Sequence, residues 1–147
     1  MSQAIDVRTP FASPIRRHGL ASLLRWVRVC DIDELTVERG CAALVRGAQV
    51  ALVRTVTGDV YAVAHTDPFS GANVIARGIV GTRGGIPTIA SPMYKQVFDL
   101  RNGRCLDTAG FQPRSGTGDL AVWDVLISDG DVLVTNTPIT PPETAFG

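Results

Sequence analysis

The chain has 147 residues, 45% of them hydrophobic, so it can bury one core of ordinary size and lacks the length for two catalytic domains. Its 14 basic and 14 acidic residues cancel, which excludes a strong long-range field that would attract nucleic acid or an anionic membrane. No apolar stretch approaches the roughly 18 residues of a membrane-spanning helix, and the N-terminus lacks the apolar core of a signal peptide, so we expect one cytoplasmic domain that binds neither membrane nor nucleic acid.

The two ends of the chain differ in composition from its middle. Residues 1–24 mix prolines, arginines and small residues without a sustained apolar period, which predicts a mobile arm or a packing extension. Residues 138–147 (PITPPETAFG) hold three prolines, which favours an extended and irregular tail. The folded domain is therefore expected over residues 25–137.

The first half of this domain has the pattern of short strands, alternating in one run and rich in valine in the others. The runs are WVRVC (26–30), CAALV (41–45), QVALVRT (49–55) and VYAVAH (60–65). Arg46-Gly47 and Thr57-Gly58-Asp59 separate the last three runs and are typical of hairpin turns. DIDELTVE (31–38) predicts a short helical turn, with Asp31 as its cap.

The second half continues the same pattern. Its apolar runs are PTIAS (87–91), QVFDL (96–100), LAVWDVLIS (120–128) and DVLVTN (131–136). Asn102-Gly103 predicts a type I′ turn that leads into a strand at 104–106, and Asp129-Gly130 predicts another turn. About eight strands with this spacing predict an all-β domain, an antiparallel barrel or sandwich.

Candidate catalytic groups are few. Nucleophilic catalysis needs a nucleophile, a base and an orienting group, yet the two histidines are His18, in the arm, and His65, at a strand end. We interpret His65 as a hydrogen-bonded structural residue rather than a catalytic base. Cys30, Cys41 and Cys105 are widely spaced and form no CxxC group, so we interpret them as buried thiols rather than reactive or metal-binding groups. The spacing of four ligands that zinc requires is absent from the sequence.

The glycine-rich stretch ARGIVGTRGGIP (76–87) has two interpretations. Its backbone amides could form an anion-binding nest between Arg77 and Arg83, although the Gly-Lys-Ser/Thr ending of a P-loop is missing. Alternatively, it is an ordered surface loop with left-handed glycines, and the arginines contact a protein partner.

Two segments resemble the ligand loops of Rieske proteins. SPMYKQVFDLRNGRCL (91–106) resembles the second loop through Pro92, Phe98, Asp99, Leu100 and Gly103. HTDPFSGANVI (65–75) resembles the first loop through Pro68, Gly71, Ala72 and Val74. On this alignment the four ligand positions hold Asp67, Phe69, Ser91 and Tyr94. A Rieske cluster needs two thiolates and two imidazoles, and phenylalanine offers no donor, so we expect no iron–sulfur cluster in this domain.

The blocks DPFS (67–70), ANVIARGIVG (72–81) and SPMYKQVFDLRNGRCLD (91–107) are similar to those of the small subunit of assimilatory NAD(P)H-dependent nitrite reductase. The resemblance extends from Trp26 to Thr135. It implies a Rieske-like fold with a two-loop tip and no prosthetic group, in a protein that accompanies a large catalytic subunit. It also implies that the large subunit holds FAD, siroheme and an iron–sulfur cluster and reduces nitrite to ammonium with reduced nicotinamide.

Two hypotheses describe what replaced the cluster. Metal bonds hold the two loops together in the parent fold, so their loss must be offset by new contacts. Phe69 could fill the vacated volume, while Asp67, Ser91 and Tyr94 form a hydrogen-bonded bridge. Alternatively, the tip docks on the large subunit. The candidate docking residues are Arg77, Arg83, Tyr94 and Lys95.

Three functions therefore remain open at the level of sequence. The first is a cofactor-free accessory subunit of nitrite reductase. The second is a stand-alone binding or regulatory module on the same fold, which the additional N-terminal arm leaves open. The third is an electron-transfer Rieske protein, which the missing ligands disfavour.

Overall fold

The computed structural model describes residues 25–114 and 116–139, so the predicted arm and all but the first two residues of the predicted tail lie outside the described part. That part contains eleven strands and two short 3-10 helices, which confirms the all-β prediction. The helices are η2 (Ile32–Glu34) and η3 (Ile75–Arg77). The strands are β1 (Trp26–Asp31), β2 (Arg39–Val45), β3 (Ala48–Arg54), β4 (Val60–Ala64), β5 (Ile79–Arg83), β6 (Ile86–Ala90), β7 (Val97–Asp99), β8 (Cys105–Asp107), β9 (Val122–Trp123), β10 (Val125–Ser128) and β11 (Asp131–Thr135).

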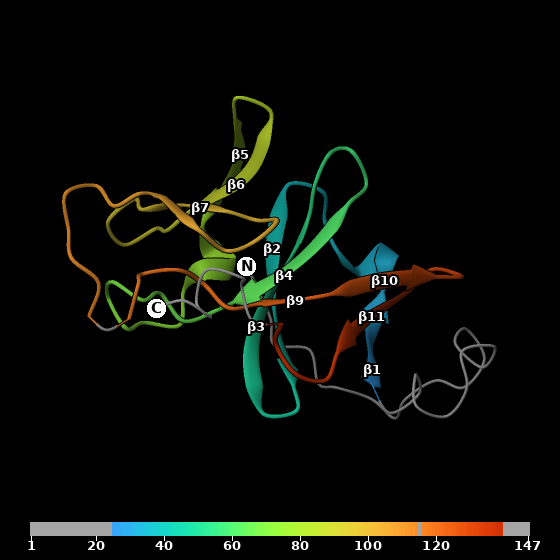
Figure 1. The fold of residues 1–147 in the computed structure, drawn as a ribbon. Coiled ribbons are helices and arrows are strands. Elements are labelled where there is room, and N and C mark those ends of the chain that lie inside the picture. The colour runs from blue at the N-terminus through green and yellow to red at the C-terminus, as the bar shows by residue number, and fades with distance from the viewer. Residues whose placement is uncertain (1–24, 115, 140–147) are drawn as a thin grey trace.

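The base of the domain is formed by two antiparallel sheets (Figure 1). One has the strand order β2-β3-β4-β9 and the other the order β1-β11-β10. Their facing side chains share a buried core that includes Val29, Leu52, Trp123 and Val134. Burying this apolar surface is the main stabilising contribution to the base.

A third antiparallel sheet, of order β5-β6-β7-β8, lies at the opposite end of the β2-β3-β4-β9 sheet from β1, and the β5–β6 hairpin projects from it (Figure 1). It covers a second core that includes Phe69, Ile89, Phe98 and Leu120. This sheet carries the loops that form the tip of the domain.

Strand β3 lies between the two cores. Val50 and Leu52 belong to the first core, whereas Ala51 and Val53 belong to the second, and all four side chains are fully buried. A strand buried on both faces needs apolar residues at every position rather than at alternate ones. This explains why QVALVRT (49–55) reads as a continuous apolar run.

Two of the predicted turns are two-residue hairpin turns of type I′, a type that was predicted from the sequence only for Asn102-Gly103. Arg46 and Gly47 have φ angles of 51° and 83°, and Asp129 and Gly130 have φ angles of 51° and 82°. The predicted turn at Thr57-Gly58-Asp59 also joins two paired strands, β3 and β4.

The turn at Asn102-Gly103 differs from the prediction. Only Gly103 has a positive φ, 79°, and its N–H donates to the Asp99 carbonyl over 2.7 Å, while the Asp99 N–H donates to the Arg104 carbonyl over 2.8 Å. Residues 100–103 therefore form a four-residue hairpin loop rather than a type I′ turn. A side chain at Gly103 is excluded in any case, because a Cβ there would lie 2.0 Å from the Leu120 carbonyl oxygen. That carbonyl belongs to a later segment whose approach the local sequence does not encode.

The strand count of about eight was too low. The run LAVWDVLIS (120–128) divides at Asp124 into β9, which pairs with β4, and β10, which pairs with β11. The Asp124 N–H donates to Thr135 Oγ1 over 3.2 Å at this corner. One apolar run therefore serves two sheets, as happens where strands pass from one sheet to another.

The helical turn predicted near residues 31–38 is present as η2, and Asp31 occupies its N-cap position, but without a side-chain cap. The Asp31 side chain makes no capping hydrogen bond, and its carboxylate lies 3.5 Å from Arg28 Nη2 instead.

In residues 25–114 and 116–139, no helix is long and apolar enough to cross a membrane.

Candidate functional site

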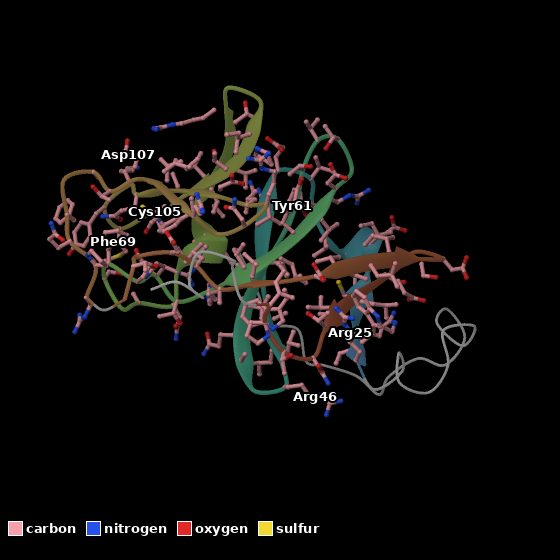
Figure 2. All side chains as sticks on the ribbon, in the orientation of Figure 1. Arg25, Arg46, Tyr61, Phe69, Cys105 and Asp107 are labelled. Carbon is pink, nitrogen blue, oxygen red and sulfur yellow. The ribbon has the colours of Figure 1, made fainter. Side chains whose placement is uncertain are left out.

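The tip of the domain is built from two loops that the sequence predicted and a third segment that it did not. Residues 65–74 connect β4 to η3, and residues 91–96 connect β6 to β7. Residues 108–114, which follow β8, lie against the first loop, because the Arg114 N–H donates to the Pro68 carbonyl over 2.9 Å. Figure 2 shows Phe69 near Cys105 and Asp107 at this end of the molecule, far from Arg25 and Arg46.

Asp67 and Ser91 join the first two loops. Both side chains are fully buried, and Ser91 Oγ donates to Asp67 Oδ2 over 2.6 Å. Asp67 Oδ1 accepts the backbone N–H of Phe69 over 2.8 Å, and Ser91 Oγ accepts that of Met93 over 3.2 Å. The hydrogen-bonded bridge expected from the sequence is therefore present between these two residues, where a buried carboxylate needs such partners.

Phe69 lies in the second core. Its ring centre is 6.3 Å from that of Phe98, with the ring planes tilted by 54°, and 6% of the residue is exposed. Gly118 lies directly beside the ring, because a Cβ at that glycine would be 3.0 Å from Phe69 Cζ. A ligand position of the Rieske frame is thus occupied by a packed aromatic ring.

Tyr94 does not join the bridge. The Lys95 N–H donates to the Ser91 carbonyl over 3.1 Å, which closes the loop and leaves Tyr94 on its exposed side. The Tyr94 ring stacks on Phe111, with 4.7 Å between ring centres and 17° between planes. The sequence interpretation missed Phe111, whose only signal is an aromatic residue in a segment of glycine, proline and polar residues.

Comparison with known proteins identifies the family. The family model described as a Rieske-like [2Fe-2S] domain matches residues 25–135. The nitrite reductase (NADH) small subunit of Salmonella typhimurium is 34% identical over 109 residues, which cover 74% of this chain and 94% of that protein. The chain belongs to the Rieske-like family of nitrite reductase small subunits. This confirms the resemblance of the three sequence blocks.

Solved structures of similar proteins have the same fold. A protein described as an NADH-dependent nitrite reductase small subunit from Mycobacterium tuberculosis matches with a TM-score of 0.67 and 40% identity, over 78% of this chain and 96% of that one. The ferredoxin of carbazole 1,9a-dioxygenase from Nocardioides aromaticivorans matches with a TM-score of 0.60 and 25% identity, over 75% of this chain and 96% of that one. The Rieske-like fold predicted from the sequence is thus confirmed.

The residues at the tip do not fit the iron–sulfur cluster after which the family domain is named. Such a cluster is bound by thiolates and imidazoles, whereas the aligned positions hold a carboxylate, a phenyl ring, a hydroxyl and a phenol. The carboxylate and the hydroxyl are already bonded to each other. Nor do three or more His, Cys, Asp or Glu side chains gather as a metal site elsewhere in the described chain.

His65 has the structural role that the sequence predicted. It is buried, and its Nδ1 accepts the Ala76 N–H over 3.1 Å, while its carbonyl accepts the N–H groups of Val74 and Ile75, each over 3.0 Å. Burial lowers the pKa of His65, and the nearby Arg77 charge lowers it further. The neutral imidazole therefore holds the first residue of the loop 65–74 against η3, the helix that follows this loop.

The four candidate docking residues come from three different elements. Tyr94 and Lys95 are neighbours in the loop 91–96 and are exposed. Arg77 ends η3 and is exposed, whereas Arg83 ends β5 and pairs with Asp107 at 3.4 Å. Tyr94 and Lys95 are therefore adjacent at the tip, whereas Arg77 and Arg83 are contributed by other elements.

The glycine-rich stretch is not a loop. It contains the end of η3 and the β5–β6 hairpin, whose two-residue turn is formed by Gly84 and Gly85 with φ angles of 54° and 83°. The Gly78 N–H donates to the Ile75 carbonyl over 2.9 Å and is not free to bind an anion. Pairing of residues 79–83 with β6 replaces the open backbone that a nest requires.

The three cysteines are thiols, and they differ in how deeply they are buried. Cys30 is buried, and desolvation raises its pKa to about 12. Cys41 and Cys105 are only partly buried, which corrects the expectation of three buried thiols. Burial also raises the pKa of Cys105, so this thiol stays protonated near neutral pH and is a poor nucleophile.

Proposed function

We propose that this chain is the cofactor-free accessory subunit of a NAD(P)H-dependent nitrite reductase. The proposal rests on the similarity to nitrite reductase small subunits, which extends over 94% of the Salmonella typhimurium protein. The residues at the former ligand positions support it, because they hold the tip together without metal bonds. The chain contributes structure and contacts, and the redox chemistry takes place in its partner.

The partner is the large catalytic subunit. A protein named nitrite reductase [NAD(P)H] large subunit from Klebsiella oxytoca is 38% identical over 112 residues, which cover 76% of this chain but 11% of that protein. This chain therefore spans about a tenth of the length of that relative. A similar domain thus occurs inside a large subunit in one organism. This supports the proposal that the two parts contact each other where they are separate chains.

The cofactors belong to that partner. By the family resemblance, the large subunit holds FAD, siroheme and an iron–sulfur cluster, and the complex reduces nitrite to ammonium in nitrogen assimilation. The complex is expected in the cytoplasm, where thiols such as those of Cys30, Cys41 and Cys105 stay reduced. Docking of the tip through Arg77, Arg83, Tyr94 and Lys95 is part of the proposal.

The decisive experiment uses the large subunit from the same source. Nicotinamide-dependent nitrite reduction is measured with and without this chain, together with co-elution of the two proteins and the iron content of this chain. Co-elution with a gain in activity, and an iron-free small subunit, is the expected result. If the proteins neither co-elute nor differ in activity, the chain is a stand-alone module instead.

A further inference from the structure

An exposed apolar cluster lies on the tip. Tyr94 and Phe111 stack on each other although 42% and 46% of these residues remain exposed, and the neighbouring Met93 is 45% exposed. These residues come from two loops that are separate in the sequence. Single exposed apolar residues are common on protein surfaces, but a stacked aromatic pair with an adjacent methionine has the composition of an interface centre.

The backbone under this cluster is preorganised. In the loop 91–96, Ser91 accepts N–H groups from Met93 and Lys95 and is tied to the buried Asp67. The Phe111 N–H donates to the Thr108 carbonyl over 3.0 Å. Such a surface loses little conformational entropy when a partner binds.

Lys95 has a left-handed backbone, with φ of 68°. A non-glycine residue in this region is uncommon, and conformations of this kind concentrate at functional sites. Lys95 is exposed and directly follows Tyr94 in the loop.

The loops that form the cluster carry exposed charge of one sign, and Asp107, which borders them, pairs with Arg83. Among residues 66–74, 91–96, 108–114 and 116–118, the charged residues are Asp67, Lys95 and Arg114, and Asp67 is buried. The opposite end of the domain carries exposed carboxylates at Asp31, Asp33, Glu34 and Asp129. The far end also carries the exposed Arg25 and Arg46 (Figure 2), so its charges have both signs, whereas the loops of the cluster carry exposed positive charge.

We propose that the stacked pair Tyr94–Phe111, with Met93, is the centre of the surface that binds the large subunit, and that Lys95 and Arg114 meet carboxylates at its rim. This proposal rests on the proposed function and specifies which residues of this chain contact the large subunit. The partner surface is then an apolar hollow bordered by Asp or Glu side chains. Arg83, which pairs with Asp107 at 3.4 Å, is not part of this apolar centre.

The test is the affinity of the full-length chain for the purified large subunit. Tyr94→Ala and Phe111→Ala are each expected to weaken binding at least about tenfold. Tyr94→Phe keeps the stacked ring and is expected to bind like the unchanged protein. Ile127→Ala is the matched control, because Ile127 is also 42% exposed but lies on β10 at the far end of the domain.

Charge reversal tests the rim. Lys95→Glu is expected to slow association, with a smaller effect at high salt. Arg46→Glu gives the same change in net charge at an exposed residue that also has a left-handed backbone, φ 51°, and is expected to leave the rate unchanged. Circular dichroism of every variant separates lost binding from lost folding.

The outcomes are distinct. Failure of the unchanged chain to bind or stimulate the large subunit overturns the proposed function, and the contact with it. Normal binding by the unchanged chain and by the Tyr94 and Phe111 variants overturns the contact alone. A third outcome also overturns the proposed contact. If light scattering shows that the unchanged chain is a dimer and that Tyr94→Ala makes it monomeric, while affinity for the large subunit is unchanged, the cluster serves self-association.

Discussion

Ser91 donates a 2.6 Å hydrogen bond to the buried carboxylate of Asp67, and this bond joins two loops at positions where Rieske proteins use metal ligands. The residues are 24 positions apart in the sequence. A bond between a hydroxyl and a carboxylate is much weaker than a set of metal–ligand bonds, so packing must supply the remaining stabilisation of the tip.

Ser91→Ala should destabilise the protein by about 1–3 kcal/mol, because it leaves Asp67 Oδ2 buried without this partner. Urea unfolding monitored by tryptophan fluorescence measures the change. The exposed bond from Thr66 Oγ1 to Asn73 Oδ1, also 2.6 Å, provides the control, and Thr66→Val should have a small effect. Equal effects of the two substitutions would contradict a structural role for the buried bond.

Phe69→Ala should cost about 3–5 kcal/mol and lower the thermal midpoint by more than about 10 °C, because it opens a cavity beside Phe98. Differential scanning calorimetry is a direct measurement. Phe111→Ala removes the same side chain at an exposed position of the tip and should lower the midpoint far less. An unchanged midpoint in the Phe69 variant would exclude the ring from the core.

Asp99 should contribute stability that is lost in acid. Burial raises its pKa, but hydrogen bonds from the side chain and backbone of Arg101 outweigh burial and hold the pKa below its ordinary value. The contribution is therefore complete above the unfolded pKa of about 3.9 and disappears as pH falls through the lower folded pKa. Asp99→Asn should flatten the loss of stability between pH 5 and pH 2 in urea unfolding, and an unaltered slope would show that Asp99 is not its source.

As pH falls, protonation of His65 should lower the stability of the protein, and it should do so at a higher pH than protonation of Asp99 does. Because burial, and then Arg77, lower the folded pKa of His65, the unfolded chain binds the proton more tightly. Stability is complete above the unfolded pKa of about 6.5 and decreases as pH falls towards the folded value. Arg77→Gln should reduce this decrease, whereas Arg46→Gln should not. An NMR titration of the His65 ring measures the pKa in each variant, and identical values would rule out the Arg77 effect.

Local sequence patterns predicted most strands and the hairpin turns with X-Gly pairs, because these features depend on backbone preferences of neighbouring residues. The type I′ turns at Arg46-Gly47 and Asp129-Gly130 are examples. The same reasoning failed at Asn102-Gly103, where the turn accommodates the later segment at Leu120, and at residues 76–87, where glycines occupy a paired hairpin.

At the tip, too, the properties of single residues could be predicted from the sequence, whereas contacts between distant segments could not. The absence of thiolate and imidazole donors at Asp67, Phe69, Ser91 and Tyr94 is a property of the residue types, so the sequence alone predicted that these positions do not suit a Rieske cluster. The sequence could not reveal that Tyr94 leaves the bridge and stacks on Phe111, because that contact depends on where the segment after β8 returns.

Residue types and local patterns were sufficient to predict the all-β class, the family and the chemistry that the former ligand positions cannot perform. The folded structure was needed to learn that β3 is buried between two cores, that one apolar run serves two sheets at Asp124, and that Tyr94 stacks on Phe111. The physical reason is that side-chain type and local backbone preference act over a few residues, whereas these contacts form between segments that meet only when the sheets close around their cores.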